Sequence, residues 1–293
     1  VDRAGGPDEN DGAPDIGEAC AASAADAVGN AAVLRGPPFQ AHDLLRIDPM
    51  TRFHGAPAWV AAALARAPWV VVRRTGAAAG LVPVGVRGAF RGERYGACIA
   101  HGQHGQHGQH GQHGQIVARV RPEALAGLDR ATGCAADGGR APRTVPALAM
   151  LPALRAVFAA ADLDWGPTGS VGFELASGVP TASETSDLDL LVRCPQPLPR
   201  AAAQRLRDAL AQVSRDHADC RIDALLETPR GAVALAEYAA TAGPVLLRTT
   251  GAPCLSEDPW ASPRAPQSTD VPTANALSAG GWRRRAVPGR AGG

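Results

Sequence analysis

The alternation of apolar and polar residues divides the central part of the chain into short strands and helices. Residues 69–72 and 81–86 are rich in valine, as β-strands are, and the glycine-containing segment between them predicts a hairpin. Residues 116–120 have the same character and predict a further strand. Residues 58–66 and 146–161 have the composition of helices. The pattern therefore indicates that helices and strands are mixed along the chain.

The second half of the chain continues this mixture and contains one long amphipathic helix. Residues 200–217 predict it, because Ala203, Leu206, Leu210, Val213 and His217 recur at helical spacing. His217 stands at the end of this predicted helix, which favours a histidine near the helix dipole over a catalytic one. A strand is expected at 220–227, a helix at 231–238 and a short strand at 244–248.

Changes of composition along the chain indicate its domain organisation. Residues 1–35 contain few large apolar side chains and predict a disordered extension. A segment rich in Gly, Ala and Pro separates an N-terminal α+β domain, expected over 36–135, from a second domain over 145–260. Residues 261–293 are rich in Pro, Ser and Arg and predict a disordered tail.

Composition and charge exclude several kinds of function. The chain has 293 residues, of which 45% are hydrophobic, and this is enough for two modest cores. A net charge of +1 gives no global attraction to nucleic acid or to membranes. Lysine is absent, which excludes Schiff-base catalysis and the P-loop motif. The six cysteines form no Cys-x-x-Cys pair, and no signal peptide or membrane span is visible, so we expect a cytoplasmic protein without a membrane partner.

Residues 101–115 are five copies of His-Gly-Gln. Histidine-rich tracts can bind divalent transition metals. A glycine at every third position, however, leaves nothing to orient the imidazoles, and this favours a low-complexity insertion in a loop. Both interpretations of the tract stay open at the level of the sequence.

Two carboxylates stand out in an apolar segment. Asp187 and Asp189 are two residues apart, so on a strand they point to one face while Leu188, Leu190 and Val192 point to the other. Adjacent carboxylates repel each other unless a proton or a cation lies between them. Mg²⁺ prefers oxygen ligands and bridges carboxylates to phosphates. The pair therefore predicts a magnesium site.

Residues elsewhere in the chain extend this candidate site towards a polyphosphate. Gly169 and Ser170 follow a turn and open a predicted helix, whose first N–H groups can bind an anion. Asp223 brings a third carboxylate on the next predicted strand, where it faces away from the apolar residues. Arg87, Arg91 and Arg94 lie in a glycine-rich turn and could hold phosphates, although such a turn is also typical of a solvated basic loop.

The order of these parts resembles the nucleotidyltransferase superfamily of the DNA polymerase β type. Around them the chain is similar to the phosphoribosyl-dephospho-CoA transferases of malonate decarboxylase, which are also called malonate decarboxylase holo-acyl-carrier-protein synthases. The residues that carry this resemblance are Trp165–Gly178, Ser186–Leu191, His42–Leu44, Trp69–Arg74 and Val82–Gly88. The resemblance covers about residues 37–260 and departs at the His-Gly-Gln tract and at both ends.

The resemblance implies an α+β protein in which a polymerase-β-type nucleotidyltransferase domain follows a smaller α+β domain. It implies transfer of the prosthetic group from 2′-(5″-triphosphoribosyl)-3′-dephospho-CoA to a serine of the acyl carrier protein of malonate decarboxylase, with release of diphosphate. In this enzyme Asp187 and Asp189 would hold Mg²⁺, and Asp223 would complete the metal site or accept the serine proton. Gly169 and Ser170 would bind the terminal phosphates, and Arg87 and Arg91 would clamp the substrate.

Two other functions remain open. A nucleotidyltransferase that modifies a protein or a small molecule with AMP would use the same metal site, and competition between ATP and the CoA-derived donor separates the two. A non-catalytic metal-binding protein built on the histidine tract is the other alternative. It predicts that deletion of residues 101–115 abolishes function, whereas the enzyme should keep its transfer activity.

Overall fold

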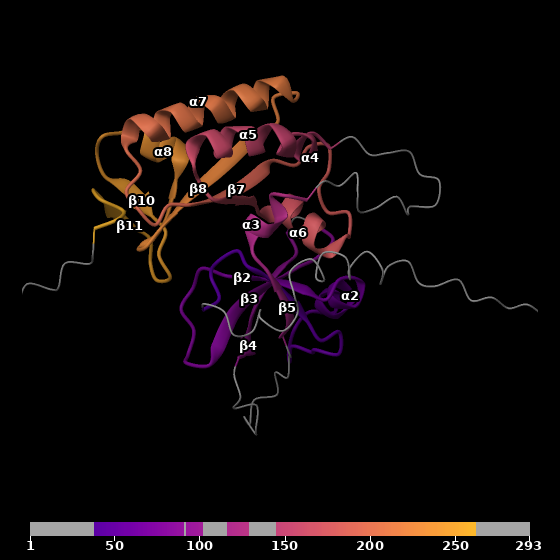
Figure 1. Ribbon diagram of the computed structural model, residues 1–293. Coiled ribbons are helices and arrows are strands. Elements are labelled where there is room, and N and C mark those ends of the chain that lie inside the picture. Colours follow the sequence, from indigo (N-terminus) through magenta and orange to yellow (C-terminus); the bar gives the residue numbers. More distant parts are fainter. Residues whose placement is uncertain (1–37, 91, 102–115, 129–144, 262–293) are drawn as a thin grey trace, which may run out of the picture. The chain divides into compact units, whose positions relative to one another are not determined.

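A computed structural model describes residues 38–90, 92–101, 116–128 and 145–261. The expected N-terminal extension, almost all of the His-Gly-Gln tract, the domain boundary and the C-terminal tail lie outside these ranges, as does Arg91. The described part is a mixed α+β structure (Figure 1). None of its helices combines the length and the apolar character that crossing a bilayer requires.

The first sheet has five strands in the order β4-β3-β2-β1-β5, and each strand is antiparallel to its neighbours. Its strands are β1 (Leu44–Ile47), β2 (Trp69–Val72), β3 (Leu81–Arg87), β4 (Arg94–Ala100) and β5 (Ile116–Val120). The predicted hairpin is confirmed, because β2 and β3 pair with Val71 opposite Gly85.

The two faces of this sheet are covered differently. Helix α2 (Ala58–Arg66) packs on one face, where its Val60 and Leu64 join the buried valines of β3. On the other face, Leu44 and Trp69 pack against Phe173 of helix α6 (Gly169–Ser177) and against helix α3 (Pro122–Leu125). This second contact lies at the β1, β2 and β5 side of the sheet, and β3 and β4 contribute no residue to it.

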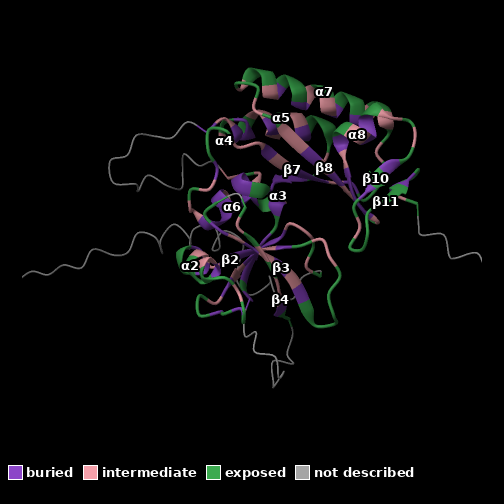
Figure 2. Cartoon of the chain, turned by 180° about the vertical axis from the view of Figure 1, so that it is seen from behind, coloured by how far each residue is buried: buried purple, intermediate pink, exposed green. Residues whose placement is uncertain are grey.

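The second sheet has four strands in the order β6-β7-β8-β9. They are β6 (Trp165–Pro167), β7 (Leu188–Arg193), β8 (Ile222–Thr228) and β9 (Gly231–Ala234). β7 and β8 are parallel, and helix α7 (Arg200–Asp216) provides the crossover that parallel neighbours require. Helices α7 and α5 (Leu151–Ala161) lie against one side of β7 and β8 (Figures 1 and 2). Leu188 and Leu190 of β7 and Leu226 of β8 are buried in the core that these elements share.

Two helix predictions need correction. Residues 231–238 are not one helix, because Gly231–Ala234 forms β9 and only Leu235–Ala240 forms helix α8. Gly231 has φ of 150° and pairs with Thr228, so the segment turns back along β8 as a hairpin. The predicted helix over 146–161 is divided into α4 (Pro146–Ala149) and α5, since Pro152 has no N–H to donate to the preceding turn.

Two short strands near the end of the described residues lie next to the second sheet. β10 (Val245–Leu247) and β11 (Cys254–Ser256) form a two-stranded antiparallel sheet, in the region where a strand was predicted at 244–248. Backbone hydrogen bonds between Ala232 and Arg248 connect this small sheet to β9.

Ion pairs join the two large sheets. Arg74 donates through Nη1 to Glu227 Oε1 at 2.7 Å, and a second hydrogen bond makes this pair bidentate. Arg193 of β7 pairs with Glu123 of α3 and faces the buried Asp43 at 4.0 Å. Since Arg193 and Glu227 are register neighbours on β7 and β8, both side chains lie on the same face of the second sheet.

Candidate active site

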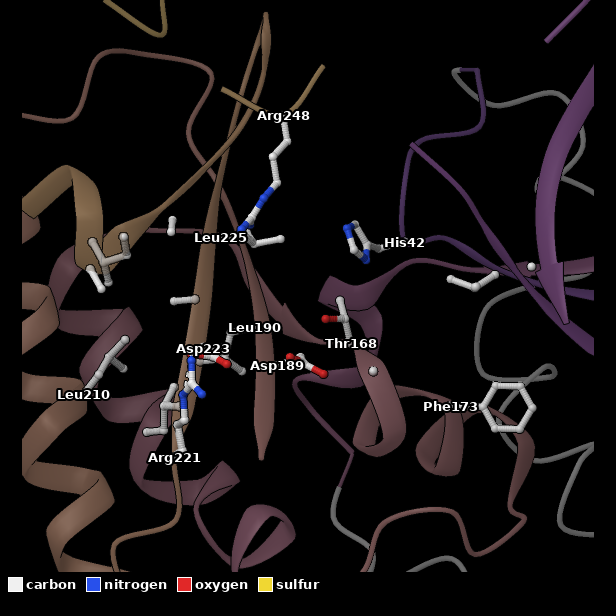
Figure 3. Close-up of a pocket in the computed structure, with 18 of the residues that line it drawn as sticks. His42, Thr168, Phe173, Asp189, Leu190, Leu210, Arg221, Asp223, Leu225 and Arg248 are labelled. Carbon is white, nitrogen blue, oxygen red and sulfur yellow. Dashed lines mark hydrogen bonds and ion pairs between the residues drawn. The ribbon is translucent and has the colours of Figure 1, made fainter. Parts of the chain in front are cut away.

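A cavity of about 1310 Å³ is lined by residues of both sheets. The first sheet contributes residues of β1, β2, β3 and β4, and the second contributes residues of β7, β8 and the start of α6. The close-up shows several of these side chains around the cavity, with His42 on one side and Asp223 on the other (Figure 3). The two groups of lining residues come from segments separated by more than 70 positions, since the first group ends at Gly96 and the second begins at Thr168.

Asp189 and Asp223 are register neighbours on the parallel strands β7 and β8, and both line the cavity. Their side chains leave the face opposite the buried Leu188 and Leu190, as strand alternation predicts. Asp187 directly precedes β7 and does not line the cavity. The structure therefore brings Asp189 and Asp223 together at the cavity, whereas Asp187 is not among the residues that line it.

The pKa of Asp189 lies above the usual aspartate value. Burial of the carboxylate is the main cause, and the negative charges of Asp223 and Asp187 raise it further. The positive charges of Arg87 and Arg221 act in the opposite direction. Arg221 also pairs directly with Asp223 at 2.9 Å. The negative charge at Asp189 is thus only partly compensated by protein groups, and a bound cation would stabilise it.

Gly169 is fitted tightly against Asp189. Its φ is +60°, in the left-handed region, and a Cβ at this position would overlap Oδ2 of Asp189 and lie 2.9 Å from its Cγ. Next to it, the N–H of Thr168 donates to the main-chain oxygen of Asp189 at 2.8 Å. The first turn of α6 can therefore approach β7 closely only because residue 169 has no side chain.

The carboxylates suit Mg²⁺ that is shared with a substrate. Within the described ranges, no group of three or more His, Cys, Asp or Glu side chains could hold a metal ion by itself. Mg²⁺ usually keeps several waters and uses one or two carboxylates together with substrate phosphates, so it does not need such a group. Asp187 and Asp189 offer oxygen atoms only, as this mode of binding requires. The cation and the phosphates would then depend on each other for binding.

The remaining predicted site residues differ in whether they line the cavity. Arg87, at the end of β3, lines the cavity and lies close enough to Asp189 to lower its pKa. Ser170 is buried and is not among the lining residues; its main-chain oxygen accepts a hydrogen bond from Thr181 Oγ1 at 2.8 Å. Arg91 lies outside the described residues.

His42 and Thr168 line the cavity, although sequence reasoning gave them no role. His42 has φ of 73°, and its pKa is lowered to about 4 by burial and by the nearby Arg74, so the imidazole is neutral at pH 7. Thr168 precedes α6 but makes no side-chain capping hydrogen bond with it. A polar residue directly before the Gly-Ser pair was the only signal in the sequence that could have indicated Thr168.

Two family models match the chain. The phosphoribosyl-dephospho-CoA transferase MdcG N-terminal domain matches residues 40–107, and the corresponding C-terminal domain matches residues 136–259. No solved structure matches significantly.

Curated relatives that carry the name phosphoribosyl-dephospho-CoA transferase are also similar to the chain. The protein from Pseudomonas putida is 42% identical over 221 residues, which are 75% of this chain and 94% of the relative. The one from Pseudomonas aeruginosa is 43% identical over 224 residues, which are 75% and 92% of the two chains. The relative from Azotobacter vinelandii is 41% identical over 223 residues, with coverage of 75% and 94%.

Proposed function

The chain belongs to the phosphoribosyl-dephospho-CoA transferase family and is therefore an enzyme that transfers a phosphorus-containing group, and we propose that its acceptor is a serine of the acyl carrier protein of malonate decarboxylase. The donor in this proposal is 2′-(5″-triphosphoribosyl)-3′-dephospho-CoA, and the second product is diphosphate. The observation that carries the proposal is the cavity in which Asp189 and Asp223 lie side by side within electrostatic reach of Arg87.

This arrangement suits a triphosphate. Asp187 and Asp189 would hold Mg²⁺, which supplies positive charge next to the phosphate oxygens. Arg87, from the first sheet, offers a guanidinium fork to the same phosphates, and Arg91 follows it in the chain. The backbone N–H groups of Gly169 and Ser170 stand at the N-terminus of α6 and would bind the terminal phosphates. Charge on the leaving diphosphate would be stabilised by these groups together.

The transfer itself is a substitution at phosphorus. The serine Oγ of the carrier forms a bond to the α-phosphorus, the bond from that phosphorus to its bridging oxygen breaks, and diphosphate leaves. In this proposal Asp223 takes the serine proton, which is supported by its position beside Asp189 and by its side chain, which is 43% exposed. Arg221 donates through Nε to Oδ1 of this carboxylate at 3.0 Å. Asp223 could instead complete the metal site, as the sequence left open.

We further propose that residues 145–260 form a polymerase-β-type nucleotidyltransferase domain and that residues 36–135 form a smaller α+β domain before it. The proposal is supported by the order of parts on the second sheet. Helix α6 begins at Gly169, the acidic pair lies at the start of β7, and the third carboxylate lies on β8. In the parallel pairing of β7 with β8, Asp189 of the pair is the register neighbour of Asp223.

The proposal is tested by incubating the purified protein with the donor, Mg²⁺ and apo-carrier, and by measuring the mass of the carrier. We expect an increase equal to the phosphoribosyl-dephospho-CoA group, and none with a carrier whose acceptor serine is replaced by alanine. The Asp189→Asn variant should transfer at least about a hundredfold more slowly, because it loses a carboxylate ligand. The proposal would be refuted by an unchanged carrier mass under conditions in which an established enzyme of the family modifies the carrier. An AMP adduct on the carrier when ATP replaces the donor would refute the assigned donor.

A further inference from the structure

Two glycines form a groove on the cavity face of the first sheet. Gly85 of β3 and Gly96 of β4 are register partners, and both line the cavity. They lie on the face opposite the valines of β3 that pack against α2. Because neither residue has a side chain, the two glycines leave a depression between the side chains of their neighbours.

The side chain of Arg73 occupies the groove. Arg73 directly follows β2, and its N–H donates to the main-chain oxygen of Pro83 at 2.9 Å, which fixes its backbone to β3. A Cβ at Gly85 would lie 3.6 Å from both Cγ and Cδ of Arg73, and a Cβ at Gly96 would lie 3.2 Å from its Cζ. The stem of Arg73 therefore crosses β3, and its guanidinium lies over β4.

Further arginines lie on the same face. Arg87 and Arg94 are register partners, each two positions from one of the glycines, so strand alternation places them beside the groove. Arg94 donates through Nη1 to the main-chain oxygens of Phe90 and Glu93, which carry no net charge. No ion pair with a carboxylate is found for Arg73 or Arg94 among the residues that the structure describes. Positive charges that gather in this way favour a bound anion.

We infer that Arg73 and Arg94, over the groove formed by Gly85 and Gly96, bind the diphosphate that links adenosine to pantetheine in the dephospho-CoA part of the donor. This inference rests on the proposed function for the identity of the donor. Such a donor carries two separate groups of phosphates, and the carboxylate end of the cavity accounts only for the triphosphate. In a chain without lysine, arginine is the residue that can bind the second group, and its planar fork matches two phosphate oxygens.

The dimensions and the lining of the cavity agree with a donor of this length. About 1310 Å³ is more than the 300–1,000 Å³ that is typical for a drug-sized ligand. Arg87 lies between the two proposed subsites, because it adjoins Arg94 on one side and influences Asp189 on the other. Leu44 and Val71 line the same cavity and offer apolar contact to the uncharged parts of the donor.

The inference is tested by titrating dephospho-CoA itself, which has the diphosphate but no triphosphoribosyl group. We expect Arg73→Gln to weaken its binding at least about tenfold, since a charge-assisted contact is lost. Gly96→Ala should weaken it as well, because the new methyl group displaces the guanidinium of Arg73 while every charge is retained. The matched controls are Arg66→Gln, on the exposed side of α2, and Gly76→Ala, whose Cβ would meet no atom within 4 Å; both should bind like the wild type.

A second probe separates this subsite from the metal site. Tripolyphosphate with Mg²⁺ should lose affinity for Asp189→Asn and keep it for Arg73→Gln, whereas dephospho-CoA should show the reverse. Circular dichroism confirms that each variant is folded. The inference is overturned if dephospho-CoA binds the wild type and Arg73→Gln equally, if it binds neither, or if Arg73→Gln only raises the KM for the carrier. If the variants change dephospho-CoA binding as expected but the wild type does not modify the carrier, the proposed acceptor is refuted and the inferred subsite stands.

Discussion

Replacing Gly169 by alanine tests directly whether the start of α6 and the acidic pair act as one unit. The residue has φ of +60°, and a Cβ there would overlap Oδ2 of Asp189. The substitution adds only a methyl group and leaves every charge in place. Any loss of transfer must therefore come from the geometry around residue 169, where the start of α6 meets the Asp189 carboxylate.

Two costs can be worked out from the structure. A left-handed backbone conformation costs a residue with a Cβ roughly 1–2 kcal/mol, so the free energy of unfolding should fall by about that amount. The new Cβ would also lie 2.9 Å from Cγ of Asp189, whereas ordinary contact begins at 3.4 Å, so Cγ must move by at least 0.5 Å. Catalytic groups need to be held within about 0.5 Å, and a misplacement of about 1 Å can cost a hundredfold in rate. We expect Gly169→Ala to transfer roughly tenfold to hundredfold more slowly.

Gly55→Ala is the matched control, because Gly55 has φ of +72° and a Cβ there would meet no atom within 4 Å. Urea denaturation should show a loss of roughly 1–2 kcal/mol in Gly55→Ala and at least this loss in Gly169→Ala, where the Asp189 side chain must also move. Transfer, measured by the mass of the carrier at a fixed time, should fall only in Gly169→Ala. Equal transfer by the two variants would show that the contact between residue 169 and Asp189 has no part in the reaction.

Three further predictions concern metal dependence, pH and the contact between the sheets. Asp189→Asn should show weakened Mg²⁺ dependence in the tripolyphosphate titration, and an unchanged Mg²⁺ requirement would exclude this carboxylate as a ligand. The pKa of His42 falls from 6.5 to about 4 on folding, so only the unfolded chain binds a proton at this histidine between those pH values. The contribution of His42 to the unfolding free energy should therefore be fully present above pH 6.5 and should be lost as the pH falls to 4, by at most about 3 kcal/mol. Urea denaturation at each pH should show that His42→Gln lacks this part of the decline. Arg193→Met should reduce the unfolding free energy by about 3 kcal/mol, because it leaves the buried Asp43 and the carboxylate of Glu123 without this cation. A reduction below about 1 kcal/mol would show that Arg119 compensates the charge of Asp43 by itself.

Many of the helices and strands could be predicted from the sequence, because their signals are local. The valines of β2 and β3, the apolar spacing of α7 and the Gly-Ser start of α6 each lie within a few neighbouring positions. The wrong assignment at Gly231–Ala234 has the same origin. Three of these four residues are Gly or Ala, which are not typical of strands, and pairing with β8 decided their conformation.

The candidate site was only partly visible in the sequence. Strand alternation determined that Asp189 and Asp223 each point away from a buried apolar face. Their adjacency depends on the parallel register of β7 and β8, which are separated in the chain by the whole of α7. The opposing wall comes from the other sheet, and no local pattern indicates that His42 or Arg73 would line the same cavity as these carboxylates.

The chain by itself thus determined which residues can form strands, which faces they bury and which carboxylates can hold a cation, since these properties follow from the side chains and the backbone period. The tertiary structure decided which charges meet. Electrostatic interactions act through space and weaken with distance, so the pKa values of Asp189 and His42 depend on strands and loops that are remote in sequence. The fit of Gly169 against Asp189 and of Arg73 over Gly96 likewise arises from packing between distant segments, where the space available to a single Cβ decides the arrangement.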